Sequence, residues 1–124
     1  MTAKRQHHVW IVEDDELFKQ SLEELVEDEE SLRLIYSVNS VEKARHGFSY
    51  QHAPDVILLD IGLPGMTGIE ALPIFKAEFP EVSIIMLTIF DDDDRILEAI
   101  QSGADGYLLK RTPGAEIRKG IREV

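Results

Sequence analysis

The chain has 124 residues, a formal net charge of −11 and no cysteine. This length favours one domain with one core, and the lack of cysteine excludes disulfides and thiolate metal sites. The acidic balance argues against direct nucleic-acid binding. The sequence has neither a signal peptide nor an apolar stretch near the ~18 residues of a membrane span, so we expect a cytoplasmic protein without a membrane partner.

Short apolar runs alternate with amphipathic segments along the chain, a pattern typical of a parallel sheet flanked by helices. We expect strands over residues 8–13, 32–38, 55–60, 82–88 and 106–109. We expect helices over residues 16–28, 40–51, 67–78, 92–103 and 113–123. The run 32–38 alternates most clearly between apolar and other residues, so we place it at an edge of the sheet.

Several expected helices begin at residues suited to capping. Asp15 is placed to cap the first helix, and Thr67 with Glu70 forms a capping-box pattern at the third. Pro73 falls inside that third helix and predicts either a kink or a later start. Four acids, Asp91–Asp94, precede the fourth helix, and we interpret them as capping residues rather than as a metal site.

Polar residues follow or end four of the expected strands, namely Glu13 with Asp14, Asp60, Thr88 and Lys110. If the strands are parallel, all these residues lie at one edge of one sheet. The carboxylates suit a hard divalent cation, and the hydroxyl and ammonium groups suit phosphate oxygens. Asp60 is the most informative, because burying a carboxylate behind an apolar run costs roughly several kcal/mol unless a cation or hydrogen bonds compensate.

Together with Tyr107, these residues occur along the chain in the order found in one known family. Over residues 1–124 the chain resembles a response-regulator receiver (CheY-like) domain of two-component signalling. The segments 60–68 and 102–110 resemble especially the receivers that precede a LuxR-type (NarL-like) helix-turn-helix domain. The resemblance implies an α/β fold of the flavodoxin-like kind. It would be a (βα)5 doubly wound, five-stranded parallel sheet with strand order 2-1-3-4-5.

The resemblance also implies a function and a set of site residues. A sensor histidine kinase or a phosphotransfer protein would donate a phosphoryl group, and the implied catalytic residues are Asp60, Thr88 and Lys110. The implied ligands of Mg²⁺ (or Mn²⁺) are Glu13 through water, Asp14, Asp60 and the backbone carbonyl of Gly62. Thr88 and Tyr107 would switch the surface of the fourth helix, fifth strand and fifth helix. Such a protein is a signalling switch that assists its own phosphorylation and dephosphorylation, not an enzyme.

Two positions depart from the usual receiver pattern. Ile89 stands where receivers mostly carry a small residue, and we expect it either to narrow access to Asp60 or to pack outward. Arg111 replaces a common proline, as in the helix-turn-helix subfamily. An output domain would follow Val124 and would contact DNA to control transcription. A stand-alone receiver is the other interpretation, and a homodimer is a further candidate assembly.

Three competing functions are weighed on the same residues. A haloacid-dehalogenase-type phosphatase needs a second Asp two residues after Asp60, where Gly62 stands. A flavodoxin-like cofactor binder needs a phosphate loop rich in Ser, Thr and Gly, and the acids Glu13–Asp15 would repel phosphate there. A degenerate receiver that acts through protein–protein interaction is the nearest alternative, and the presence of all the expected site residues argues against it.

Overall fold

The computed structural model describes residues 6–47 and 52–124, which form five strands and five α-helices in alternation. The strands are β1 (His7–Val12), β2 (Leu32–Val38), β3 (Val56–Leu59), β4 (Ser83–Thr88) and β5 (Gly106–Leu109). The helices are α1 (Glu16–Glu27), α2 (Val41–His46), α3 (Gly68–Glu78), α4 (Asp93–Gln101) and α5 (Gly114–Glu123).

All neighbouring strands pair in parallel, in the order β2-β1-β3-β4-β5. This is the predicted doubly wound α/β sheet, and β2 lies at an edge as its alternating sequence indicated. β3 is the central strand and all four of its residues are buried. Burial on both faces explains why its sequence is an uninterrupted apolar run.

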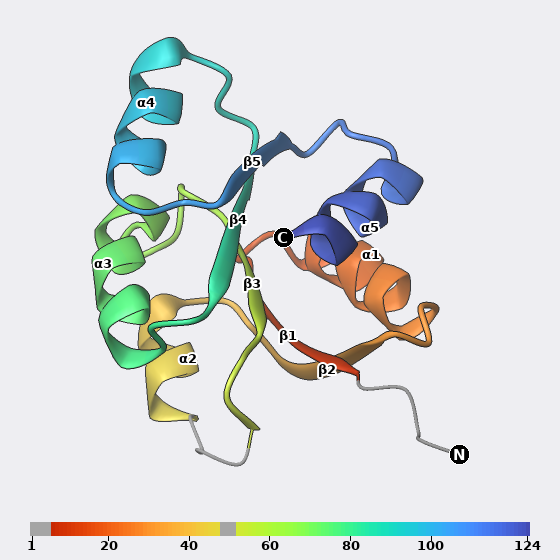
Figure 1. Cartoon of the computed structure of the whole chain (residues 1–124). Coiled ribbons are helices and arrows are strands. Elements are labelled where there is room, and N and C mark those ends of the chain that lie inside the picture. Colours follow the sequence, from red (N-terminus) through yellow and green to blue (C-terminus); the bar gives the residue numbers. More distant parts are fainter. Residues whose placement is uncertain (1–5, 48–51) are drawn as a thin grey trace.

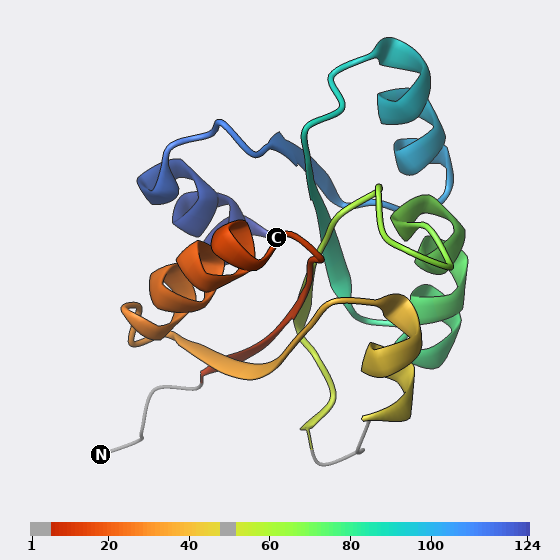
Figure 2. The same ribbon diagram turned by 180° about the vertical axis from the view of Figure 1, so that it is seen from behind.

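Helices cover both faces of the sheet, with α1 and α5 on one side and α2, α3 and α4 on the other (Figures 1 and 2). Successive strand residues point to opposite faces. Trp10 and Ile57 therefore belong to the core cluster under α2, α3 and α4, whereas Val9 and Leu58 belong to the cluster under α1 and α5. The two clusters pack the sheet between the helical layers and leave its carboxyl edge to the loops that follow the strands.

The predicted helix caps are present. Asp15 Oδ1 accepts hydrogen bonds from two amides in the first turn of α1, and Asp92 caps α4. Thr67 and Glu70 form the complete capping box of α3, which begins directly after Thr67. The alternative of a later start for α3 is therefore wrong, and the helix continues through Pro73.

The helices are short, from 6 to 12 residues. α2 ends at His46, with Gly47 as its C-cap, so the predicted helix over 40–51 is too long; residues 48–51 lie outside the described part of the chain. The other nine elements match their predicted bounds to within two residues. None of the helices in the described residues is long and apolar enough to cross a bilayer.

Candidate functional site

The polar residues predicted at the strand ends come together at the carboxyl edge of the sheet. Glu13 follows β1, Asp60 follows β3, Thr88 ends β4 and Lys110 follows β5. Parallel pairing places these four ends side by side, in the order β1-β3-β4-β5. This is the edge at which open α/β sheets bind their ligands.

Three carboxylates form one cluster at this edge. Glu13, Asp14 and Asp60 each place an oxygen within 4.8 Å of the other two. Glu13 and Asp60 are only 2% and 7% exposed, whereas Asp14 is exposed. Buried anions at this spacing repel one another strongly, so the cluster requires positive charge. The three acids are those that the sequence analysis singled out as metal ligands.

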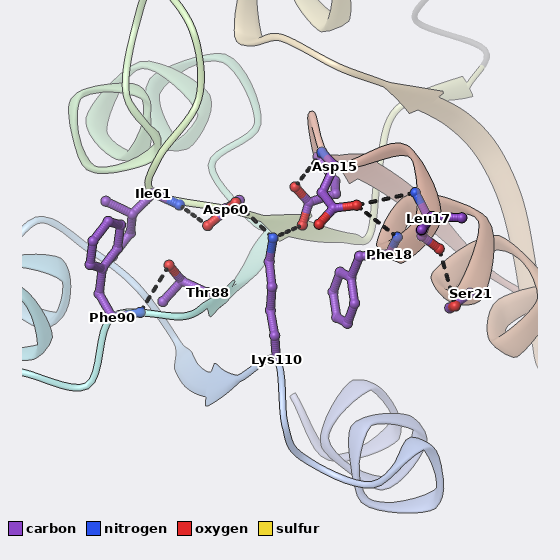
Figure 3. A network of polar contacts seen from close by, with 10 residues as sticks. Asp15, Leu17, Phe18, Ser21, Asp60, Ile61, Thr88, Phe90 and Lys110 are labelled. Atoms are coloured by element: carbon purple, nitrogen blue, oxygen red, sulfur yellow. Dashed lines mark hydrogen bonds and ion pairs between the residues drawn. The ribbon is translucent and has the colours of Figure 1, made fainter.

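Lys110 brings positive charge into this cluster (Figure 3). Its Nζ lies 2.6 Å from Glu13 Oε1 and 3.1 Å from Asp60 Oδ2. The same Nζ lies 4.9 Å from the centre of the Phe18 ring of α1, a cation–π contact. The sequence predicts Lys110 beside phosphate oxygens, but its pairing with Glu13 was not predicted.

Asp60 is fixed in place by the backbone around it. Its N–H donates to the carbonyl of Val12 across the β1–β3 pair at 3.2 Å, and its Oδ1 accepts from the N–H of Ile61 at 2.7 Å. Gly68, the first residue of α3, approaches so closely that a Cβ there would overlap the Asp60 carbonyl oxygen. Asp60 is thus held by β1 on one side and by the start of α3 on the other.

Burial alters the protonation of the cluster. It raises the pKa of Glu13 to about 7; the Asp60 charge adds to the rise, and Lys110 and the N–H of Asp15 oppose it. Burial also lowers the pKa of Lys110, but contacts with Glu13 and Asp60 outweigh that effect and raise this pKa overall. Lys110 therefore stays protonated, while burial disfavours the charged form of Glu13, which a second cation would stabilise.

The oxygen atoms of the cluster fit a hard divalent cation. Glu13 Oε1 is buried without a hydrogen bond of good geometry, and its polar neighbour is the Lys110 ammonium. Carboxylate oxygens are the ligands that Mg²⁺ prefers, and the exposure of Asp14 leaves room for the waters that Mg²⁺ usually keeps. Asp15 does not belong to the cluster, because its carboxylate caps α1. The residues present thus fit Mg²⁺ or Mn²⁺.

The two predicted switch residues meet through a third residue, Phe90. Thr88 is fully buried, and its Oγ1 accepts a long hydrogen bond of 3.5 Å from the N–H of Phe90. Figure 3 shows this hydroxyl turned toward Phe90, on the side away from Lys110. Tyr107 donates its hydroxyl proton to the Phe90 carbonyl at 2.6 Å, and burial raises the pKa of Tyr107, so the hydroxyl stays a donor.

Phe90 also lies beside Gly62, the loop residue predicted to offer a carbonyl to the metal. A Cβ on Gly62 would lie 3.4 Å from Phe90 Cε2. Sequence reasoning missed Phe90, because a single aromatic residue after a strand has neither a periodic pattern nor a motif. It singled out Ile89 instead, which is 72% exposed and lines a cavity of about 190 Å³ with Leu109, Lys110 and Arg111. Gating by Ile89 stays a prediction.

The sequence matches a known protein family and several of its relatives. The family model described as response regulator receiver domain matches residues 9–122. The nitrate/nitrite response regulator protein homolog of Haemophilus influenzae is 32% identical over 118 residues, 94% of this chain and 55% of that protein. The transcriptional regulatory protein LiaR of Bacillus subtilis is 34% identical over 114 residues, 92% of this chain and 54% of that protein. The chain therefore spans about half the length of these curated relatives.

A solved structure shows the same fold. The DNA-binding response regulator of the LuxR family from Staphylococcus aureus superposes with a TM-score of 0.86 at 24% identity, covering 94% of this chain and 97% of that chain. At this identity the likeness bears on the fold alone. It agrees with the strand order and with the alternation of strands and helices described above.

Proposed function

Because the chain belongs to the family of response regulator receiver domains of the NarL/LuxR type, we propose that Asp60 accepts a phosphoryl group from the phosphohistidine of a sensor histidine kinase or phosphotransfer protein. One observation carries the proposal. Asp60 is a buried carboxylate at the ligand-binding edge of the sheet, in contact with the Lys110 ammonium and clustered with two further acids.

The transfer exchanges one bond to phosphorus for another. A carboxylate oxygen of Asp60 attacks the phosphorus atom, the phosphorus–nitrogen bond of the donor breaks, and the imidazole nitrogen keeps the electron pair and takes up a proton. Such transfers need positioning and charge neutralisation more than covalent help from the protein. Bound Mg²⁺, held by Asp14, Asp60, the Gly62 carbonyl and, through water, Glu13, would neutralise charge on the transferring group.

Lys110 and Thr88 act on the oxygens of the phosphoryl group. The Lys110 ammonium already lies 3.1 Å from Asp60 Oδ2, so it can pair with a phosphoryl oxygen after a small displacement. Thr88 must turn its hydroxyl away from the Phe90 amide to donate a hydrogen bond there. That turn vacates space toward which Tyr107 can move, and the surface of α4, β5 and α5 changes as a result.

This switch defines the proposed partners. The changed α4–β5–α5 surface would act on an output domain that binds DNA, or on a second copy of the chain in a homodimer. The domain is proposed to act as a switch that assists its own phosphorylation and dephosphorylation rather than as an enzyme with a separate substrate. The cytoplasmic location predicted from the sequence belongs to this proposal.

Mass spectrometry tests the proposal directly. Incubation with acetyl phosphate and Mg²⁺ should add one phosphoryl mass, and Asp60→Asn should abolish it. Asp91→Asn, which changes an exposed acid outside the cluster, is the matched control and should label like the wild type. Removal of divalent cations with EDTA should also prevent labelling. Undiminished labelling of Asp60→Asn would place the acceptor elsewhere.

A further inference from the structure

Phe90 contacts three parts of the site that come from different segments of the sequence. Its N–H approaches Thr88 Oγ1 at 3.5 Å, and its carbonyl accepts the 2.6 Å hydrogen bond from Tyr107. Its ring lies beside the backbone of Gly62, where a Cβ would be 3.4 Å from Cε2. One residue thus contacts both switch hydroxyls and the loop that follows Asp60.

The Arg95 side chain also contacts the Phe90 ring. Its guanidinium carbon lies 4.2 Å from the ring centre, within the range of a cation–π contact. The same guanidinium makes a 2.9 Å ion pair with Asp92, the residue that caps α4. The ring therefore contacts both Arg95, in the first turn of α4, and the Gly62 backbone.

We propose that Phe90, clamped by Arg95, is a positioning residue for phosphoryl transfer at Asp60, an inference that rests on the function proposed above. The ring holds the Gly62 backbone in place, and the Phe90 main chain holds the two switch hydroxyls. Phe90 does not touch the reacting atoms. It acts through the loop and the hydroxyls that it orients.

The geometry of the loop explains why a ring is needed there. Gly62 is exposed and has no side chain with which to anchor itself, so the packing comes from Phe90. Leucine at position 90 would fill part of this space but would lose the flat face on which Arg95 stacks. Because a catalytic geometry tolerates little displacement, loosening the ring should slow the transfer even with every reacting group present.

Substitutions in the whole chain test the clamp, with acetyl phosphate as donor and saturating Mg²⁺. Phe90→Leu and Arg95→Gln should each slow phosphoryl uptake about three- to tenfold, while both variants still unfold cooperatively on heating. Arg95→Lys keeps a cation over the ring and should restore most of the rate. Leu97→Ala removes an exposed side chain of α4 and is the matched control, with an uptake rate like that of the wild type.

The double variant tests whether Arg95 acts through Phe90. If it does, Phe90→Leu combined with Arg95→Gln should be no slower than Phe90→Leu alone, because the clamp is already lost. Fully additive losses would show that Arg95 acts elsewhere and would overturn the clamp. Faster uptake by Phe90→Leu would make the ring a barrier to the donor and would also overturn the proposal.

Amide hydrogen exchange gives a readout without any phosphodonor. The N–H of Ile61 bonds to Asp60 Oδ1, so its exchange reports on the loop at the acceptor. Exchange at Ile61 and Gly62 should speed up in Phe90→Leu and Arg95→Gln, and unchanged exchange in both would overturn the positioning role. If uptake and exchange are unchanged while Asp60→Asn abolishes labelling, the proposed function stands and this inference fails. If the wild type itself takes up no phosphoryl group, the proposed function fails, and the inference with it.

Discussion

Lys110 lies closer to Glu13 than to the proposed acceptor. Its Nζ is 2.6 Å from Glu13 Oε1 and 3.1 Å from Asp60 Oδ2. One ammonium thus pairs with two buried carboxylates, and a bound divalent cation would interact with the same two carboxylates. Two cations at one cluster repel each other, so Lys110 should weaken metal binding even though it assists the transfer.

The first prediction separates these two effects of Lys110. Lys110→Gln should strengthen Mg²⁺ binding about fivefold, which corresponds to about 1 kcal/mol of relieved repulsion between charges near a solvated site. The same variant should take up phosphoryl groups from acetyl phosphate much more slowly, because a phosphoryl oxygen loses its cationic partner. Calorimetry measures the first effect and mass spectrometry the second. Lys119→Gln in α5 is the control, and weaker Mg²⁺ binding by Lys110→Gln would contradict the repulsion.

The second prediction concerns two adjacent acids with different tasks. Asp14 belongs to the acidic cluster, whereas Asp15 caps α1 through two backbone amides. Asp14→Ala should therefore weaken Mg²⁺ affinity in calorimetry and leave the free energy of unfolding nearly unchanged. Asp15→Ala should lower the free energy of unfolding by about 1 kcal/mol in urea and spare Mg²⁺ affinity. Equal losses of Mg²⁺ affinity in both variants would show that the cluster is assigned wrongly.

The sequence predicted the parts of the site that each strand carries by itself. Four of the five apolar runs ended in, or next to, a polar residue that the structure places at the sheet edge, so the acids, Thr88 and Lys110 could be named in advance. The pairing of Lys110 with Glu13 and the stack of Arg95 on Phe90 could not, because they join segments whose mutual approach depends on how helices and strands pack. The helix predicted over residues 40–51 ran past the true end of α2, although glycine, which stands at position 47 as the C-cap, is a residue that commonly ends helices.

The third prediction uses the pH dependence of an acid that holds the loop after Asp60. Glu42 of α2 accepts a 3.1 Å hydrogen bond from the N–H of Met66, and that bond lowers the pKa of Glu42 below its ordinary 4.5. A carboxyl group whose pKa is lower in the folded state than in the unfolded state stabilises the fold at pH values above its unfolded-state pKa. That stability is lost as the pH falls through its folded-state pKa.

Glu42→Gln should therefore be less stable than the wild type at pH 7, and the difference should shrink as the pH falls from about 5 to 3. Urea unfolding at several pH values measures it. Glu81→Gln changes an exposed acid outside this contact and serves as the control. A difference between Glu42→Gln and the wild type that stays constant down to pH 3 would mean that the Glu42 charge does not hold the loop.

The last prediction concerns the close approach of α3 to β3. In sequence Gly68 is one of three evenly spaced glycines near Asp60, but only at Gly68 would a Cβ overlap the Asp60 carbonyl oxygen. Gly68→Ala must push α3 away from β3 or displace Asp60. The variant should lose about 2–4 kcal/mol of unfolding free energy in urea despite the better helix propensity of alanine. It should also take up phosphoryl groups more slowly than its stability alone explains, because Asp60 moves.

Gly120→Ala in α5 is the matched control, since its Cβ would meet only the flexible Leu108 Cδ1 at 3.4 Å. That variant should be as stable as the wild type or gain about 0.5–1 kcal/mol, because glycine is the poorer helix former. The contrast between the two variants isolates the helix–strand contact from helix propensity. If Gly68→Ala and Gly120→Ala were equally stable, α3 would not press on the Asp60 carbonyl, and the acceptor would owe its position to β1 and the Ile61 amide alone.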